Sequence, residues 1–205
     1  MITKFNVKSF KSLESLEDLE LGQVNVFVGA NGSGKSNLLE ALGVLGAAAF
    51  GRIDDETLLR RGVRPGVPQL YKSSFRGTKQ PKEIRFSVEI SGARYEVGMF
   101  NPAEDPQPAL RFHTESLINN GKEVIGRSNR SKEKFNPEAG LAALKRVTLK
   151  ENTPTLQLLD LISSYCIYSP NTQTLRGLVP DSQQRKPLGL AGGRLPEAVN
   201  ELFLT

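Results

Sequence analysis

The segment from Val26 to Leu42, VFVGANGSGKSNLLEAL, constrains the fold of this chain more than any other. An apolar, β-branched run leads into a glycine-rich turn, and residues 29–36 match the pattern G-x-x-x-x-G-K-[ST] without deviation. Glycines allow successive backbone N–H groups to converge on one anion, and the N-terminus of the helix that follows adds a partial positive charge. The segment therefore predicts a strand, a phosphate-binding loop and a helix, in that order.

The side chains of this loop have separate expected roles. We expect Lys35 to supply a positive charge to the outer phosphates of a nucleotide and the Ser36 hydroxyl to bind Mg²⁺. The candidate binding residues are Asn31, Gly32, Ser33, Gly34, Lys35, Ser36 and Asn37.

The hydrophobic pattern predicts a mixed α/β fold. Residues 24–29 form a short continuous apolar run, which is typical of a strand buried on both faces. Alternating patterns predict strands at 2–10 and 15–22 and two hairpins, at 83–100 with a turn near 91–92 and at 110–127 with a turn at 119–121. Helices are expected from Ser36 onward and over 195–204, and 155–170 should be a helix that runs into a strand.

Composition and rare residues exclude several classes of protein. No apolar run approaches the roughly 20 residues that span a bilayer, and the N-terminus lacks the apolar core of a signal peptide, so we expect a cytoplasmic protein without a membrane partner. The single cysteine and single histidine exclude an internal disulfide framework and a Cys/His metal cluster. We expect Cys166 to be a small buried residue and His113 to be an ordinary strand residue.

The positive charge of the chain is concentrated in its middle third. Residues 52–150 hold 19 basic and 12 acidic side chains, a net charge of +7, whereas 1–51 and 151–205 each hold 4 basic and 5 acidic ones. Such a bias indicates either a surface for nucleic acid or another polyanion, or an ordinary solvated surface, and the sequence leaves both open.

Residues 5–45, FNVKSFKSLESLEDLELGQVNVFVGANGSGKSNLLEALGVL, resemble the opening of the ABC-type ATPases of the SMC, RecF and OLD kind. Asn31, Gly32 and Asn37 match the form of the loop found in that group. The resemblance implies the N-terminal lobe of an ABC-type head, with ATP and Mg²⁺ as ligands and a homodimer closed head-to-tail through the nucleotide site. It also places Lys11 and Ser12, together with Phe10, near the nucleotide.

The resemblance divides the chain into three parts. Residues 1–51 should hold the strand pair and the P-loop unit, 52–150 a basic β-rich insertion, and 151–205 the return to the ATPase core. The resemblance also implies a glutamine that ends a core strand beside Mg²⁺ and the attacking water, and Gln173 is the best-placed candidate; the alternative is an exposed loop glutamine.

Two further motifs of the ATPases have weak counterparts here. Asp160 follows apolar residues as a Walker B aspartate would, but no acidic residue comes next and a helix explains the run better. LAGGR, at 190–194, has only the outline of a signature motif. We therefore expect an ATP-binding lobe of an ATPase that acts in DNA metabolism or anti-phage defence, with the catalytic carboxylates outside this chain; the alternative is an ATP-sensing scaffold that recruits an effector protein.

Overall fold

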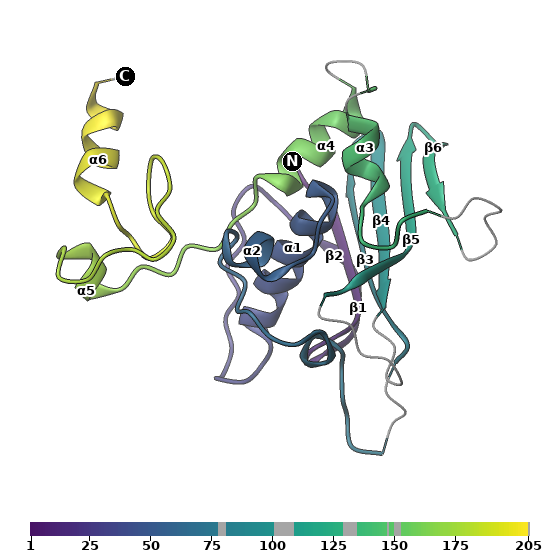
Figure 1. The fold of residues 1–205 in the computed structure, drawn as a ribbon, viewed down its shortest axis with the longest axis horizontal. Helices are drawn as coiled ribbons and strands as arrows, with labels where there is room; N and C mark the ends of the chain where they lie inside the picture. Colours follow the sequence, from purple (N-terminus) through teal and green to yellow (C-terminus); the bar gives the residue numbers. More distant parts are fainter. Residues whose placement is uncertain (78–80, 101–108, 129–134, 147, 150–152, 205) are drawn as a thin grey trace.

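The structure is a computed structural model, and it describes residues 1–77, 81–100, 109–128, 135–146, 148–149 and 153–204. A six-stranded antiparallel sheet in the order β2-β1-β3-β4-β5-β6 forms its centre (Figure 1). The strands are β1 (Lys4–Phe10), β2 (Leu13–Glu20), β3 (Glu83–Ile90), β4 (Ala93–Phe100), β5 (Arg111–Asn119) and β6 (Lys122–Arg127). The helices are α1 (Lys35–Phe50), α2 (Asp55–Leu59), α3 (Leu141–Arg146), α4 (Pro154–Ser163), α5 (Thr172–Leu175) and α6 (Leu195–Phe203), with a 3-10 turn η1 (Pro68–Tyr71).

Both predicted hairpins are confirmed, and so is the mixed α/β class. The turn between β3 and β4 uses Gly92 with φ of 81°, and the turn between β5 and β6 uses Asn120 and Gly121 with φ of 47° and 77°. Tight hairpin turns require positive φ, which glycine and asparagine adopt at low cost. The four strands of the 52–150 segment continue the sheet that β1 and β2 begin, since β1 pairs with β3.

The alternation of inward and outward side chains along β1 shifts by one residue near the end of the strand. Phe5 and Val7 alternate toward the core, and Phe10, three residues later, is also fully buried. Strict alternation would turn Phe10 to the opposite face. Ser9 lies between them with φ of 64°, a left-handed conformation that shifts the alternation by one residue.

Helix α1 is the centre of the helical layer that covers one face of the sheet (Figure 1). Two of its glycines permit close packing. A Cβ on Gly46 would lie 2.4 Å from the carbonyl oxygen of Ile162 in α4, and a Cβ on Gly43 would lie 2.5 Å from Cγ2 of Val63. Real Cβ atoms do not approach other atoms so closely, so larger residues here would force α1 away from its neighbours.

The predicted buried strand at 24–29 is wrong. The segment has no regular secondary structure, and Val24, Val26 and Val28 are 84%, 80% and 89% exposed, whereas Phe27 packs against the core. A strand that is buried on both faces needs neighbours that cover it. No strand among the described residues pairs with this segment, so its valines lie in solvent.

The end of the chain also departs from the prediction. The helix α4 is present, but residues 165–170 form an irregular segment instead of a strand, and Cys166 is half-buried. This segment is held by single backbone hydrogen bonds to different partners, such as Ile167 to Arg61 and Ser169 to Leu190, and not by a continuous ladder. Helices α5 and α6 follow it and stand away from the sheet (Figure 1). Among the described residues, no helix has both the length and the apolarity needed to cross a bilayer.

Candidate functional site

The predicted phosphate-binding loop surrounds a pocket of about 340 Å³ at the N-terminus of α1. Its lining consists almost wholly of loop residues and includes one residue from the 52–77 segment: Asn31, Gly32, Gly34, Lys35, Ser36, Asn37 and Arg64. Asn31, Gly32, Ser33 and Ser36 are exposed, so the loop is open to a ligand.

Two glycines of the loop have a left-handed backbone conformation. Gly32 and Gly34 have φ of 83° and 96°, a region that side-chain-bearing residues rarely adopt. Gly34 is the N-cap of α1 and no side chain caps the helix, so the N–H groups of the first turn are left for another acceptor. A Cβ on Gly34 would also lie only 3.1 Å from Oγ of Ser12. The close approach of Ser12 is therefore a second reason for a glycine at this position.

The ammonium group of Lys35 lies against its own loop. Nζ donates hydrogen bonds to the carbonyl oxygens of Gly29 and Ala30, each at 2.7 Å, and lies 3.4 Å from Oγ of Ser33. All three partners are neutral. An anion in the pocket would offer a stronger charge-assisted acceptor to the same group.

The structure brings Ser12, from the turn between β1 and β2, to the loop. Nδ2 of Asn37 donates to Oγ of Ser12 at 2.7 Å, and Nη2 of Arg64 lies 3.4 Å from Oδ1 of Asn37. Asn37 therefore connects the β1–β2 turn to the basic segment after α2.

Lys11 points elsewhere, toward a buried carboxylate on α1. Its Nζ pairs with Glu40, which is 3% exposed and also pairs with Arg64, and Nζ lies 4.9 Å from the ring centroid of Tyr71. Lys11 lines a neighbouring pocket of about 380 Å³ that shares Arg64 with the loop pocket. Burial is the largest influence on Glu40 and opposes its ionisation, but hydrogen bonds from Arg64 and Lys11 outweigh it and keep the pKa of Glu40 below its ordinary value.

Glu40 and Arg64 were not predicted as residues of this site. The signal for Glu40 was an acidic residue inside the otherwise apolar stretch 38–49. A carboxylate at such a position is buried, and a buried carboxylate needs cationic partners. Arg64 gave no comparable signal, because only the fold brings it to α1.

Three weaker candidates lie outside this pocket. Gln173 is an exposed residue of α5 and does not line the loop pocket, and Asp160 lies on the exposed side of α4, as the helix interpretation predicted. The LAGGR segment is organised by Asp181, whose carboxylate accepts hydrogen bonds from the amides of Ala191 (2.9 Å) and Gly193 (3.0 Å). A Cβ on Gly193 would lie 2.6 Å from Cβ of Asp181. Close packing against Asp181 therefore explains the glycine at this position.

Part of the positive charge in the middle third is compensated on the sheet. Arg85 pairs with Glu83, and Arg94 pairs with Glu89 and Glu96. His113, which lies in β5 as predicted, contacts the same Glu83 through Nδ1 at 3.1 Å. These pairs favour an ordinary solvated surface at this part of the sheet.

Comparison with known proteins agrees with this site. The sequence profile of the family described as "AAA domain, putative AbiEii toxin, Type IV TA system" matches residues 24–152, which include the whole loop and α1. The chain belongs to this family. It is an ABC-type P-loop ATPase of the SMC/RecF-like group.

Individual relatives of this AAA domain point to the same group. The "DNA replication and repair protein RecF" of Halothermothrix orenii is 37% identical over 92 residues, which are 44% of this chain and 23% of the relative. The "DNA double-strand break repair Rad50 ATPase" of Saccharolobus solfataricus is 33% identical over 73 residues, 36% of this chain and 8% of the relative. An uncharacterized protein of Methanocaldococcus jannaschii is 34% identical over 95 residues, 44% of this chain and 42% of the relative. In each case the chain matches less than half of the length of the relative.

Proposed function

We propose that this chain is the ATP-binding lobe of a RecF/Rad50-type ATPase and that the pocket at the N-terminus of α1 holds the phosphates. The observation that carries the proposal is the open cradle of residues 29–37, with two left-handed glycines, an uncapped helix N-terminus and a lysine held only by neutral acceptors. Each of these features favours the binding of an anion in the pocket.

The residues of the cradle fit ATP and Mg²⁺. A Cβ on Gly32 would meet no atom within 4 Å, so there is open space over the loop for a phosphate. The N–H groups of the first turn of α1 and Nζ of Lys35 would hold the β- and γ-phosphates, and the exposed Ser36 hydroxyl would bind the metal. Mg²⁺ would neutralise phosphate charge when it is bound.

Residues of the β1–β2 turn extend the proposed site. Ser12 contacts Asn37 directly, and we assign it to the nucleotide side of the loop. Lys11 would act on the nucleotide only if it left Glu40, so its proposed role is to hold Glu40 and, through it, Arg64 at the edge of the pocket. The exposed rim of the loop supports a further proposal, that a second copy closes over the nucleotide.

Hydrolysis is assigned to the complete protein. None of the described residues that line the loop pocket is a carboxylate, and activating water requires a general base. Glu40 lies nearby, but it is buried and held by two cations. This observation favours nucleotide binding without turnover as the second candidate function for this chain. The RecF and Rad50 relatives support a role of the complete protein in DNA repair.

Replacement of Ser36 by alanine tests the proposed metal contact. Because we assign the Mg²⁺ contact of the loop to this hydroxyl, the gain in ATP affinity on adding Mg²⁺ should fall about tenfold, and the affinity without Mg²⁺ should change little. Calorimetric titration of the chain with ATP, with and without Mg²⁺, measures both values. Ser15→Ala, on exposed β2, is the matched control. Equal loss with and without Mg²⁺ would count against metal binding by Ser36.

A further inference from the structure

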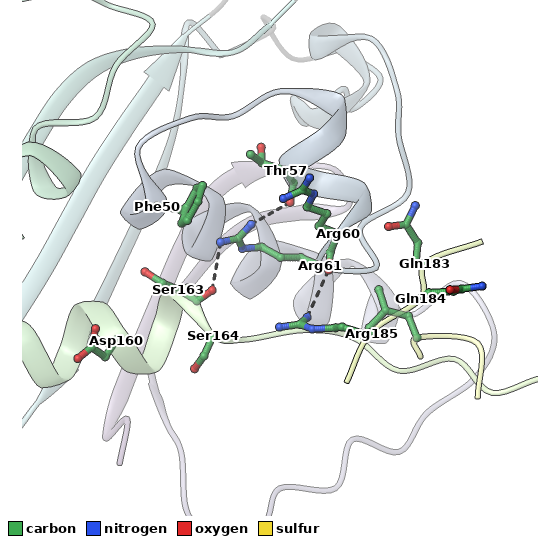
Figure 2. A pocket seen from close by; sticks show the side chains of 11 residues that line it. Phe50, Thr57, Arg60, Arg61, Asp160, Ser163, Ser164, Gln183, Gln184 and Arg185 are labelled. Carbon is green, nitrogen blue, oxygen red and sulfur yellow. Dashed lines mark hydrogen bonds between the residues drawn. The ribbon is translucent and has the colours of Figure 1, made fainter. Parts of the chain in front are cut away.

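A second pocket, of about 600 Å³, lies between α2, the end of α4 and residues 183–190 (Figure 2). It shares no lining residue with the phosphate-binding loop. Three arginines line it: Arg60 and Arg61 after α2, and Arg185 from the segment that precedes α6. The pocket thus gathers cationic side chains from parts of the chain that are more than a hundred residues apart.

Arg61 is a buried cation with no carboxylate partner among the described residues. It is 7% exposed. Its Nη1 donates to the carbonyl oxygen of Thr57 at 2.9 Å and its Nη2 to that of Ser163 at 3.1 Å, while its Nε has no hydrogen-bond partner. Neutral carbonyls do not balance a buried positive charge, and an uncompensated buried charge is costly.

Of the other two arginines, only Arg185 adds to this imbalance. Nη1 of Arg185 donates to the carbonyl oxygen of Arg60 at 3.4 Å, and Arg185 forms no ion pair with any described residue. Burial, and next the positive charge of Arg185, lower the pKa of Arg61. Arg60 is balanced by Glu56. Asp160 lies at the opposite end of the pocket from Arg185 in Figure 2.

We propose that this pocket binds a phosphate monoester, carried either by a free mononucleotide-sized ligand or by the terminal phosphate of a nucleic-acid strand. The guanidinium groups of Arg61 and Arg185 would hold the phosphate oxygens. The proposal is independent of nucleotide binding at the loop.

The charge and the size of the pocket select this ligand class. Two guanidinium groups that form no ion pair with the described residues suit a ligand with about two negative charges, and a phosphate monoester carries about −1.5 to −2 at neutral pH. The planar fork of arginine matches phosphate oxygens. A volume of about 600 Å³ exceeds the needs of inorganic phosphate and falls in the range of small-ligand sites. The side chains of Ser164, Gln183 and Gln184 supply neutral polar groups to the remainder of a ligand.

The test uses the chain with Lys35→Ala, so that the loop does not compete for phosphate. Three probes are titrated: thymidine 5′-monophosphate, an oligothymidylate with a 5′-phosphate, and the same oligothymidylate without it. We expect at least one phosphate-bearing probe to bind and Arg185→Gln to weaken it about tenfold, since a hydrogen-bonded charge is removed. Arg176→Gln, an exposed arginine that does not line the pocket, should leave the affinity unchanged.

Which of the three probes bind shows the source of the phosphate and tests the proposal. Binding of the mononucleotide alone assigns a free ligand, and binding of the phosphorylated strand alone assigns a nucleic-acid end. The proposal is overturned if no phosphate-bearing probe binds, if Arg185→Gln binds them as the parent does, or if the strand binds equally without its 5′-phosphate. Arg185→Gln in a chain with Lys35 intact should retain ATP binding, which shows that the variant folds.

Discussion

Replacing Lys35 with alanine should lower the affinity of the chain for ATP by at least about 100-fold. Lys35 is the only charged side chain in residues 29–37, and its Nζ is held at 2.7 Å from two carbonyl oxygens of its own loop. Moving Nζ from these neutral acceptors to phosphate oxygens exchanges ordinary hydrogen bonds for charge-assisted ones. The alanine variant has no ammonium group to make these charge-assisted hydrogen bonds. Equilibrium titration with ATP measures the resulting loss of affinity.

Lys8→Ala is the matched control, because Lys8 is an exposed lysine on β1 outside the pocket. Its affinity for ATP should equal that of the unmodified chain, and both variants should unfold at the same temperature as that chain. If Lys35→Ala bound ATP as tightly as Lys8→Ala, the nucleotide would have to sit elsewhere on the molecule.

Replacing Glu115 with alanine should lower the free energy of unfolding by about 3–5 kcal/mol, the largest effect on stability that we expect. Glu115 is 2% exposed in β5 and accepts hydrogen bonds from the amides of Leu141 (2.7 Å) and Ala142 (2.9 Å) and from the hydroxyl of Tyr95 (3.0 Å). Its removal leaves three buried donors without this acceptor. It also removes a carboxylate that lies 4.0 Å from the buried guanidinium of Arg127.

Denaturant unfolding measures this loss, with Glu14→Ala on exposed β2 as the control, which should change stability by less than about 0.5 kcal/mol. A similarly small change in the free energy of unfolding of Glu115→Ala would show that the hydrogen bonds between Glu115 and α3 do not stabilise the fold.

The variant Glu115→Gln separates the charge of this side chain from its hydrogen bonds. Burial, the largest influence, raises the pKa of the Glu115 carboxyl, although the amides of Ala142 and Leu141 act against it. A carboxyl with a raised folded pKa stabilises the fold most below its ordinary value of 4.5 and loses that stabilisation as the pH rises through the folded value. Glutamine does not ionise, so Glu115→Gln should lack this decline and cost less than alanine. An unchanged pH dependence in Glu115→Gln would contradict the raised pKa.

Local patterns predicted most of the sheet and the central helix. The hairpins at 83–100 and 110–127 followed from alternation and from glycine and asparagine at the turns, and α1 followed from the glycine-rich loop and its apolar helical face. These signals are local, because the turn residues and the strands that they join lie within about 20 residues of each other.

Features that depend on distant segments could not be predicted in the same way. The valines at 24, 26 and 28 have the pattern of a buried strand, but burial requires a neighbouring strand, and the described part of the chain supplies none. Arg64 reaches Asn37 and Glu40 only because the segment after α2 returns to α1. Arg61 and Arg185 meet in one pocket for the same kind of reason.

The most direct test of the proposed nucleotide site is to follow the backbone amide resonances of the chain by NMR while ATP and Mg²⁺ are added. The amides at 32–37 would contact the phosphates, so their resonances should move most, and Lys35→Ala should abolish these changes. Changes confined to other residues, such as those around Arg61 and Arg185, or the same changes at 32–37 in Lys35→Ala, would contradict the assignment of this loop as the ATP site.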